Sequence, residues 1–135
     1  MMPENARNNI MHSTLILSQK ARLMASDVYD PKDAVTIGDD VAISVNFPSE
    51  KHIDDAYAKL SAGGTIMVPL ANQFWGGRFG QFKDKFGVLW MFHFQATGDC
   101  ENEFSIMPYL RFDKTCDEVM RHIRSIIGGN IDSMV

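Results

Sequence analysis

Two histidines lie in apolar, strand-like segments, where an imidazole could act as an acid or a base. His12 belongs to IMHSTLIL and His93 to LWMFHFQ. Histidine titrates near neutral pH, so either ring could contact a ligand or move a proton. The simpler interpretation is a partly buried histidine bonded to a neighbour, because neither has a catalytic partner at a recognisable spacing. His52 and His122 fall on predicted helices and are expected to face solvent.

Three charged side chains are further candidates for chemistry. Arg78 and Arg111 could each hold an anion through paired hydrogen bonds, and an ion pair with a nearby Asp or Glu explains them equally well. Asp84 could serve as a catalytic carboxylate, but it stands in the turn-like run Asp-Lys-Phe-Gly. We therefore predict a structural turn residue at Asp84.

The pairs Gly63-Gly64 and Gly128-Gly129 lack the strand–G-x-G-x-x-G–helix context of a nucleotide site.

Composition limits the classes of function. The chain has 135 residues, 45% of them hydrophobic and 22% charged, which is typical of one globular domain. A net charge of −4 without a basic run argues against a nucleic-acid surface. No apolar stretch approaches the roughly 20 residues of a membrane helix, and MMPENARNN is no secretion signal, so we predict a cytoplasmic protein. Cys100 and Cys116 stand at no metal or redox spacing.

The segment from Gln73 to Gln95 is predicted to be a β-hairpin that organises the chain. It holds both tryptophans and six of the nine phenylalanines. Strands at 79–83 and 88–95 flank a turn at 84–87, whose glycine can adopt a positive φ. The two-residue period of the second strand separates an apolar face (Val88, Trp90, Phe92, Phe94) from a mixed face (Leu89, Met91, His93, Gln95).

The remaining elements follow from periodicity and capping residues. Strands are predicted at residues 10–17, 21–28, 41–47, 65–70 and 105–112. One helix begins after the N-cap Ser49 and ends at Gly63-Gly64. A second begins at a capping box of Thr115 and Glu118 and ends at Gly128-Gly129, before a last strand in NIDSMV. These elements predict an α+β fold.

The sequence repeats one supersecondary unit. The two glycine pairs lie 65 positions apart, and at the same offset Phe47 matches Phe112 and Ile66 matches Ile131. Each copy reads strand, capped helix, Gly-Gly, strand, and the first copy continues into the hairpin to give β-α-β-β-β. The second copy lacks two strands, which the N-terminal segments could supply. We therefore predict one domain, 1–135, in which 1–28 and 104–135 make one module and 41–95 the other.

Several segments together resemble the PhnB-like branch of the vicinal-oxygen-chelate superfamily, which also contains glyoxalase and bleomycin-resistance proteins. The matching pieces are MHSTLIL, RLMASDV, AISVNF, AYAKLSAGGTIMVPLANQFWGGRFGQFKDKFGVLWMF and IMPYLRFDKTCDEVMRHIRSIIGG, of which FWGGRFGQFKDKFGVLW is the most specific. In usual PhnB-like chains the PYL-F strand and its helix come first, whereas here they come last. The order indicates a circular permutation or, alternatively, half of a module swapped between two chains.

The resemblance implies paired β-α-β-β-β modules that form a curved mixed sheet around a cavity, with helices on the outer face and a homodimer as the assembly. The faces expected under the helices carry Val41, Ile43, Val45, Phe47, Val88, Trp90, Phe92, Phe94, Pro108, Leu110 and Phe112. The mixed faces expected to line the cavity carry Arg22, Met24, Ser26, Ala42, Ser44, Asn46, Leu89, Met91, His93, Gln95, Met107, Tyr109 and Arg111. The candidate ligand-binding residues are His12, Met24, Trp75, Arg78, Met91, His93, Met107 and Tyr109.

Many superfamily enzymes bind a divalent metal through His and Glu at four strand positions. The resemblance places Met107, Met24, Met91 and about Asp40 there, and thioethers are poor ligands for Zn, Ni, Fe or Mn. An error in the assumed strand register would replace Met91 by His93. We predict no metal and no cofactor. The methyltransferase-like label given to some family members is discounted, because the chain has no glycine-rich loop that could bind the cofactor of a methyltransferase.

Three functions remain open. The first is a metal-independent small-molecule binding protein with an apolar cavity, in which the methionines form an adaptable floor. The second is a lyase, isomerase or dioxygenase type of enzyme that uses His12 or His93. The third is an oligomerisation module whose cavity is vestigial. None of the three involves nucleic acid or a membrane, and the sequence does not identify the ligand.

Overall fold

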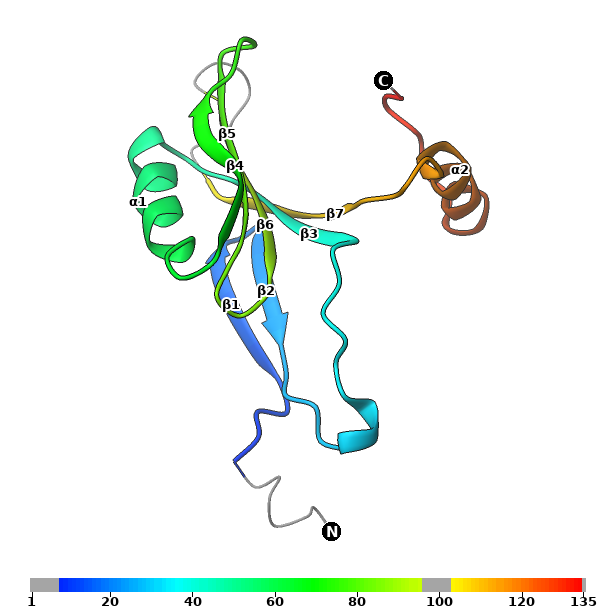
Figure 1. Cartoon of the computed structure of the whole chain (residues 1–135). Coiled ribbons are helices and arrows are strands. Elements are labelled where there is room, and N and C mark those ends of the chain that lie inside the picture. The colour runs from blue at the N-terminus through cyan, green and yellow to red at the C-terminus, as the bar shows by residue number, and fades with distance from the viewer. Residues whose placement is uncertain (1–7, 96–102, 135) are drawn as a thin grey trace.

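A computed structural model describes residues 8–95 and 103–134, and these residues form an α+β fold (Figure 1). A mixed sheet has the strand order β4-β5-β6-β3-β7, and β1 and β2 form a separate antiparallel sheet. The elements are β1 Ser13–Ser18, β2 Ala21–Ala25, the 3-10 turn η2 Pro31–Asp33, β3 Val41–Asn46, α1 Glu50–Leu60, β4 Thr65–Asn72, β5 Gly77–Lys83, β6 Leu89–Gln95, β7 Ser105–Leu110 and α2 Cys116–Ile127. Within the described residues, neither helix has the length and apolar character needed to span a bilayer.

Residues 41–95 form the strand–helix–strand–strand–strand order that the sequence predicts. β3 pairs in parallel with β6, with Ile43 opposite Trp90, while β5 pairs antiparallel with β6 and β4 antiparallel with β5. Ser49 caps α1 as predicted, because its side chain accepts a hydrogen bond of 3.2 Å from the His52 amide.

α1 covers one face of this sheet and creates the core. Ile53 and Tyr57, four residues apart on the helix, are both buried. They pack on aromatic residues of the strands, and the Tyr57 ring lies 5.1 Å from Phe82 and 6.4 Å from Phe92. The full buried cluster is Val45, Phe47, Ile53, Tyr57, Phe82 and Phe92.

Asp84 fixes the turn between β5 and β6. One carboxylate oxygen accepts from the amides of Phe86 at 2.8 Å and Val88 at 3.0 Å. The other oxygen accepts from Trp90 Nε1 at 2.9 Å, and only 6% of the residue is exposed. The structural role predicted for Asp84 is therefore confirmed.

The glycines that follow the two helices have different structural roles. Gly63 has a φ of +76°, the left-handed conformation expected just beyond a helix. At Gly64 a Cβ atom would lie 2.1 Å from the carbonyl oxygen of Lys83, so only glycine allows the chain to cross the β5–β6 turn this closely. At Gly129, which occupies the matching place after α2, nothing lies within 4 Å of such an atom.

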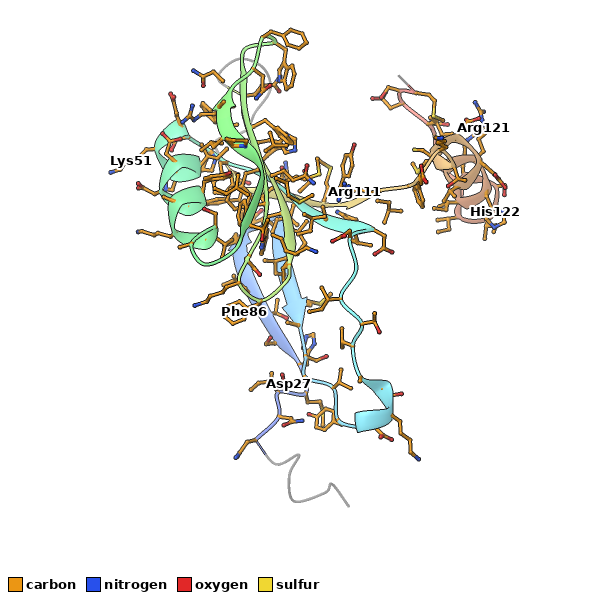
Figure 2. All side chains as sticks on the ribbon, viewed as in Figure 1. Asp27, Lys51, Phe86, Arg111, Arg121 and His122 are labelled. Carbon is orange, nitrogen blue, oxygen red and sulfur yellow. The ribbon has the colours of Figure 1, made fainter. Side chains whose placement is uncertain are left out.

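α2 stands away from both sheets and has no buried residue (Figure 1). Figure 2 shows its side chains, among them Arg121 and His122, separated from those around α1 by the extended β7. The prediction that helices cover the outer face of the sheet therefore holds for α1 and not for α2.

α2 starts where predicted, but the predicted capping box is wrong, because the Thr115 side chain makes no capping hydrogen bond. Residues 130–134 form no strand, since no neighbouring strand lies beside them.

Both outer strands of the five-stranded sheet are interrupted. β4 contains Pro69, and its pairing with β5 shifts register between Ile66 and Val68 and again before Ala71. β7, at the opposite edge, contains Pro108. Proline lacks an amide hydrogen and is confined to such edge positions.

Candidate functional site

The face of the sheet opposite α1 carries two cross-strand rows of mixed side chains. The first row, across β5, β6, β3 and β7, is Phe79, His93, Asn46 and Ser105. The second row is Gln81, Met91, Ser44 and Met107. Because side chains alternate along a strand, residues of the α1-facing core and residues of these rows occupy opposite faces. The mixed face predicted from the two-residue period is thus present on β3, β6 and β7.

His93 lies at the centre of the first row and is half-buried. Its ring centroid lies 4.9 Å from that of Phe79, with an angle of 48° between the planes. Burial lowers the pKa of His93 below its ordinary value of 6.5, because a partly dry site disfavours the imidazolium. Next to it, Asn46 Nδ2 donates to Ser105 Oγ at 3.2 Å. At neutral pH the site therefore presents a neutral imidazole beside an oriented amide.

A pocket of about 310 Å³ opens beside His93. Its lining residues are Asn46, Trp75, Arg78, His93, Phe94 and Gln95. Three residues that the sequence singled out, Trp75, Arg78 and His93, are brought together here. The sequence also placed Asn46 and Gln95 on a mixed face, but nothing in their types marked them as lining this pocket. The contact of Phe79 with His93 follows from the register of the β5–β6 hairpin, which could have been predicted from the length of the turn.

Arg78 and Trp75 form the rim of the pocket. Arg78 Nε donates to Asp54 Oδ1 at 2.7 Å and Nη1 to Asn72 Oδ1 at 3.0 Å, so α1 and β4 both fix the guanidinium. Trp75 is exposed on the loop before β5, where its ring packs at 4.9 Å on that of Phe74. The rim thus offers an aromatic face and a cation whose charge is already partly balanced.

The other candidate residues lie outside this pocket. Met91, buried, and Met107, exposed, flank Ser44 in the second row, and Tyr109 is exposed opposite Ala42. His12 and Met24 belong to the β1–β2 hairpin or the segment leading into it, and both are exposed. His12 Nε2 lies 3.2 Å from Thr14 Oγ1. Arg111 Nη1 donates to the backbone carbonyl of Asp39 at 3.1 Å.

Residues 4–92 match the model of the Glyoxalase/Bleomycin resistance protein/Dioxygenase superfamily. The chain belongs to this superfamily. It is similar to protein PA1353 from Pseudomonas aeruginosa, a crystal structure, with 33% identity, a TM-score of 0.61 and coverage of 69% of this chain and 68% of that one. It is also similar to a putative 3-demethylubiquinone-9 3-methyltransferase, PhnB protein, from Bacillus cereus, with 28% identity, a TM-score of 0.52 and coverage of 64% and 65%. No match was found among curated proteins.

The residues predicted at the positions where many superfamily enzymes hold a metal do not fit a hard divalent ion. The family resemblance places Met24, Met91, Met107 and about Asp40 there, and thioethers bind such ions poorly. Met91 and Met107 lie in one row with Ser44 between them, and Met24 lies on the separate hairpin. Within residues 8–95 and 103–134, no three His, Cys, Asp or Glu side chains gather as a metal site would need. No chemical step through a metal follows from this donor set.

Burial of His93 makes the stability of the fold depend on pH. In the unfolded chain the residue titrates near 6.5, whereas burial holds its folded pKa lower, so the unfolded state binds the proton first. The free energy of unfolding should therefore be highest above 6.5 and fall as the pH drops through 6.5 toward the lower folded pKa. His93→Gln should remove this part of the slope. Urea denaturation of both proteins at about pH 7.5 and about pH 5.5 measures the effect. The prediction is contradicted if the free energy of unfolding changes equally between the two pH values in the wild type and in His93→Gln.

Proposed function

We propose that this superfamily member binds a small aromatic or apolar molecule in the pocket beside His93, without a metal. The observation that carries the proposal is the half-buried His93 in a pocket of about 310 Å³ that also holds Trp75 and Phe94. Small-molecule sites are of this size and combine apolar walls with a few directed polar groups. A site without a metal also agrees with the methionines that the family resemblance predicts at the metal positions, because thioethers bind hard divalent ions poorly.

The polar groups of the pocket favour a ligand that is neutral. A neutral imidazole offers one donor and one acceptor, and the side-chain amides of Asn46 and Gln95 add both kinds. The positive charge of Arg78 is offset by Asp54, at 2.7 Å, which reduces its attraction for an anion. An aromatic ring with one hydroxyl or ring N–H group matches these features, with the ring against Trp75 and Phe94.

The second candidate is an enzyme in which His93 transfers a proton. Its support is the lowered pKa of His93, which leaves the imidazole free to accept a proton at neutral pH. A proton transfer would also need a second group that gives or takes a proton, and the amides of Asn46 and Gln95, which line the pocket with His93, are neither acids nor bases near neutral pH. The PhnB protein from Bacillus cereus is described as a putative methyltransferase, and that description concerns the other protein. Binding without catalysis is therefore proposed first.

An NMR titration with indole and phenol tests the binding proposal. We expect changes in the amide chemical shifts of residues 46, 75 and 93–95. Cyclohexanol, which matches phenol in size but has no aromatic face, should cause smaller changes. His93→Ala should weaken indole binding about tenfold, the loss of one hydrogen bond with its packing. Trp75→Ala, at an exposed position, should weaken it without disturbing the fold, and His122→Ala on α2 is the matched control.

Two results would overturn the binding proposal. One is the absence of shifts at these residues with every probe up to millimolar concentration. The other is stoichiometric binding of a divalent metal at His93, seen as paramagnetic line broadening with Mn²⁺ or as chemical-shift changes with Zn²⁺, which would place a metal two residues along β6 from Met91.

A further inference from the structure

We propose that the ligand of the pocket beside His93 is an arylalkylamine, whose ring lies in that pocket and whose ammonium group lies in a second pocket beside Glu50. The second subsite depends on the proposed function, because the ring must first occupy the pocket beside His93. That pocket takes the uncharged part of the ligand, and the positive charge lies beyond Arg78.

The second pocket, which we call the Glu50 pocket, adjoins the first. It has a volume of about 240 Å³ and is lined by Glu50, Asn72, Gly76, Arg78 and Phe94. Arg78 and Phe94 also line the pocket beside His93, so the two spaces share these walls. The first pocket alone, at about 310 Å³, lies at the lower end of the roughly 300–1,000 Å³ of small-molecule sites. A ligand that extends into the Glu50 pocket therefore gains a second set of contacts.

Strand register builds the shared wall. Asn72 on β4 pairs with Arg78 on β5, and Arg78 pairs with Phe94 on β6, so the three side chains form one row across the sheet. The two pockets thus meet where β5 begins and β6 ends. Gly76, in the loop before β5, has no side chain to fill the space, and a Cβ atom there would meet nothing within 4 Å. The sheet fixes this wall, while the Glu50 pocket stays open toward the loop.

Glu50 gives the second pocket a carboxylate without a partner. Glu50 and Asp54 are four residues apart on α1, so their side chains lie one turn apart on the same helix face. Asp54 bonds the guanidinium of Arg78. Within residues 8–95 and 103–134, by contrast, the Glu50 carboxylate has no hydrogen-bond or ion-pair partner. Lys51, the next residue, projects from α1 away from the strands (Figure 2).

The charges on this wall favour a cation. Two carboxylates, Asp54 and Glu50, accompany one guanidinium, and Arg78 Nε and Nη1 are already donated to Asp54 and Asn72. The guanidinium is therefore poorly available to an anion. A carboxylate only accepts hydrogen bonds, whereas an ammonium group supplies three donors and the opposite charge. The ring of Phe94 adds an aromatic surface of the kind that attracts cations.

Three indole compounds test the Glu50 pocket on the wild-type chain. Tryptamine and tryptophol share the ring and a two-carbon chain and differ only in the terminal ammonium or hydroxyl group. In NMR titrations at about pH 7, tryptamine should have a dissociation constant about fivefold lower than that of tryptophol, the upper range for an ion pair with an exposed carboxylate. Indole-3-propionate, an anion, should bind most weakly. All three should shift the amide signals of residues 93–95, and tryptamine should also shift that of residue 50.

Glu50→Gln removes the charge and keeps the size of the side chain. Tryptamine and tryptophol should bind this variant equally well, and amide chemical shifts away from α1 report whether it keeps its fold. Asp55→Asn is the matched control, because it removes the same charge from an exposed position of α1 outside both pockets. It should preserve the fivefold difference.

The outcomes distinguish a failure of the Glu50 pocket from a failure of the pocket beside His93. If indole and tryptophol bind at residues 93–95 but tryptamine binds no more tightly, the Glu50 pocket is no subsite and the binding proposal stands. If Asp55→Asn abolishes the difference as fully as Glu50→Gln, the preference comes from the general negative charge of α1, and the subsite is again wrong. If no indole compound shifts residues 46, 75 or 93–95, both proposals are overturned. The comparison of tryptamine with tryptophol does not depend on the folding of any variant.

Discussion

Phe92→Ala is expected to lower the free energy of unfolding by about 3–5 kcal/mol, the typical cost of removing a buried aromatic ring. Phe92 is 2% exposed and lies at the centre of the core. Its ring centroid is 4.6 Å from Phe47, 5.0 Å from Phe82 and 6.0 Å from Trp90. These three rings and that of Tyr57, at 6.4 Å, would lose packing, and the rigid sheet cannot collapse fully into the space.

The matched control is Phe74→Ala, the same chemical change at a residue that is 98% exposed. It should alter the free energy of unfolding by less than about 0.5 kcal/mol. Urea denaturation under identical conditions measures both variants. Similar losses at Phe74 and Phe92 would show that the core is not centred under α1.

Asp84→Ala is expected to cost about 3 kcal/mol, because it removes the acceptor for three donors, one of them the indole of Trp90. Asp84→Asn should cost less. Its amide oxygen can still accept from Phe86 and Val88, but the amide nitrogen then faces Trp90 Nε1, and two donors cannot bond to each other.

A double-mutant cycle isolates the contact between Asp84 and Trp90. Combining Asp84→Asn with Trp90→Phe removes the opposed donor, so the pair should lose less stability than the sum of the single changes. Asp55→Asn, on the exposed side of α1, is the control and should be nearly neutral. Strict additivity, or an Asp84→Ala variant as stable as the wild type, would contradict the structural role of this carboxylate.

Local patterns predicted residues 41–95 well. The helix stripe of Ile53 and Tyr57, the cap at Ser49 and the turn at Asp84 depend on neighbours within a few positions, and sequence spacing records such contacts. The helix stop at Gly63-Gly64 was also predicted. The close approach of Gly64 to Lys83 was not, because no local rule reports the distance to a strand 19 positions away.

The second half was predicted less well, for a physical reason. The capping box at Thr115 fails because this residue has a φ of −112° and a ψ of 10°, not the extended backbone typical of an N-cap. The last strand after Gly129 presumes a neighbouring strand, which sequence spacing does not report. Periodicity reveals that α2 has an apolar stripe, but not whether this stripe is covered within one chain. The site shows the same limit: the spacing placed His93 on a mixed face, while the pairing of Arg78 with Asp54 joins β5 to α1 and depends on how the helix packs on the sheet.

The prolines of the two outer strands have a consequence for how copies of this chain can meet. A sheet edge with an unbroken row of amide hydrogens invites further strands and, at high concentration, fibrous aggregates. Pro69 and the register shifts interrupt that row on β4, and Pro108 interrupts it on β7. Endless side-by-side growth of the five-stranded sheet is thereby disfavoured at both ends. A chain whose β1–β2 hairpin and α2 are largely exposed is thus protected at the sheet edges where uncontrolled stacking would otherwise begin.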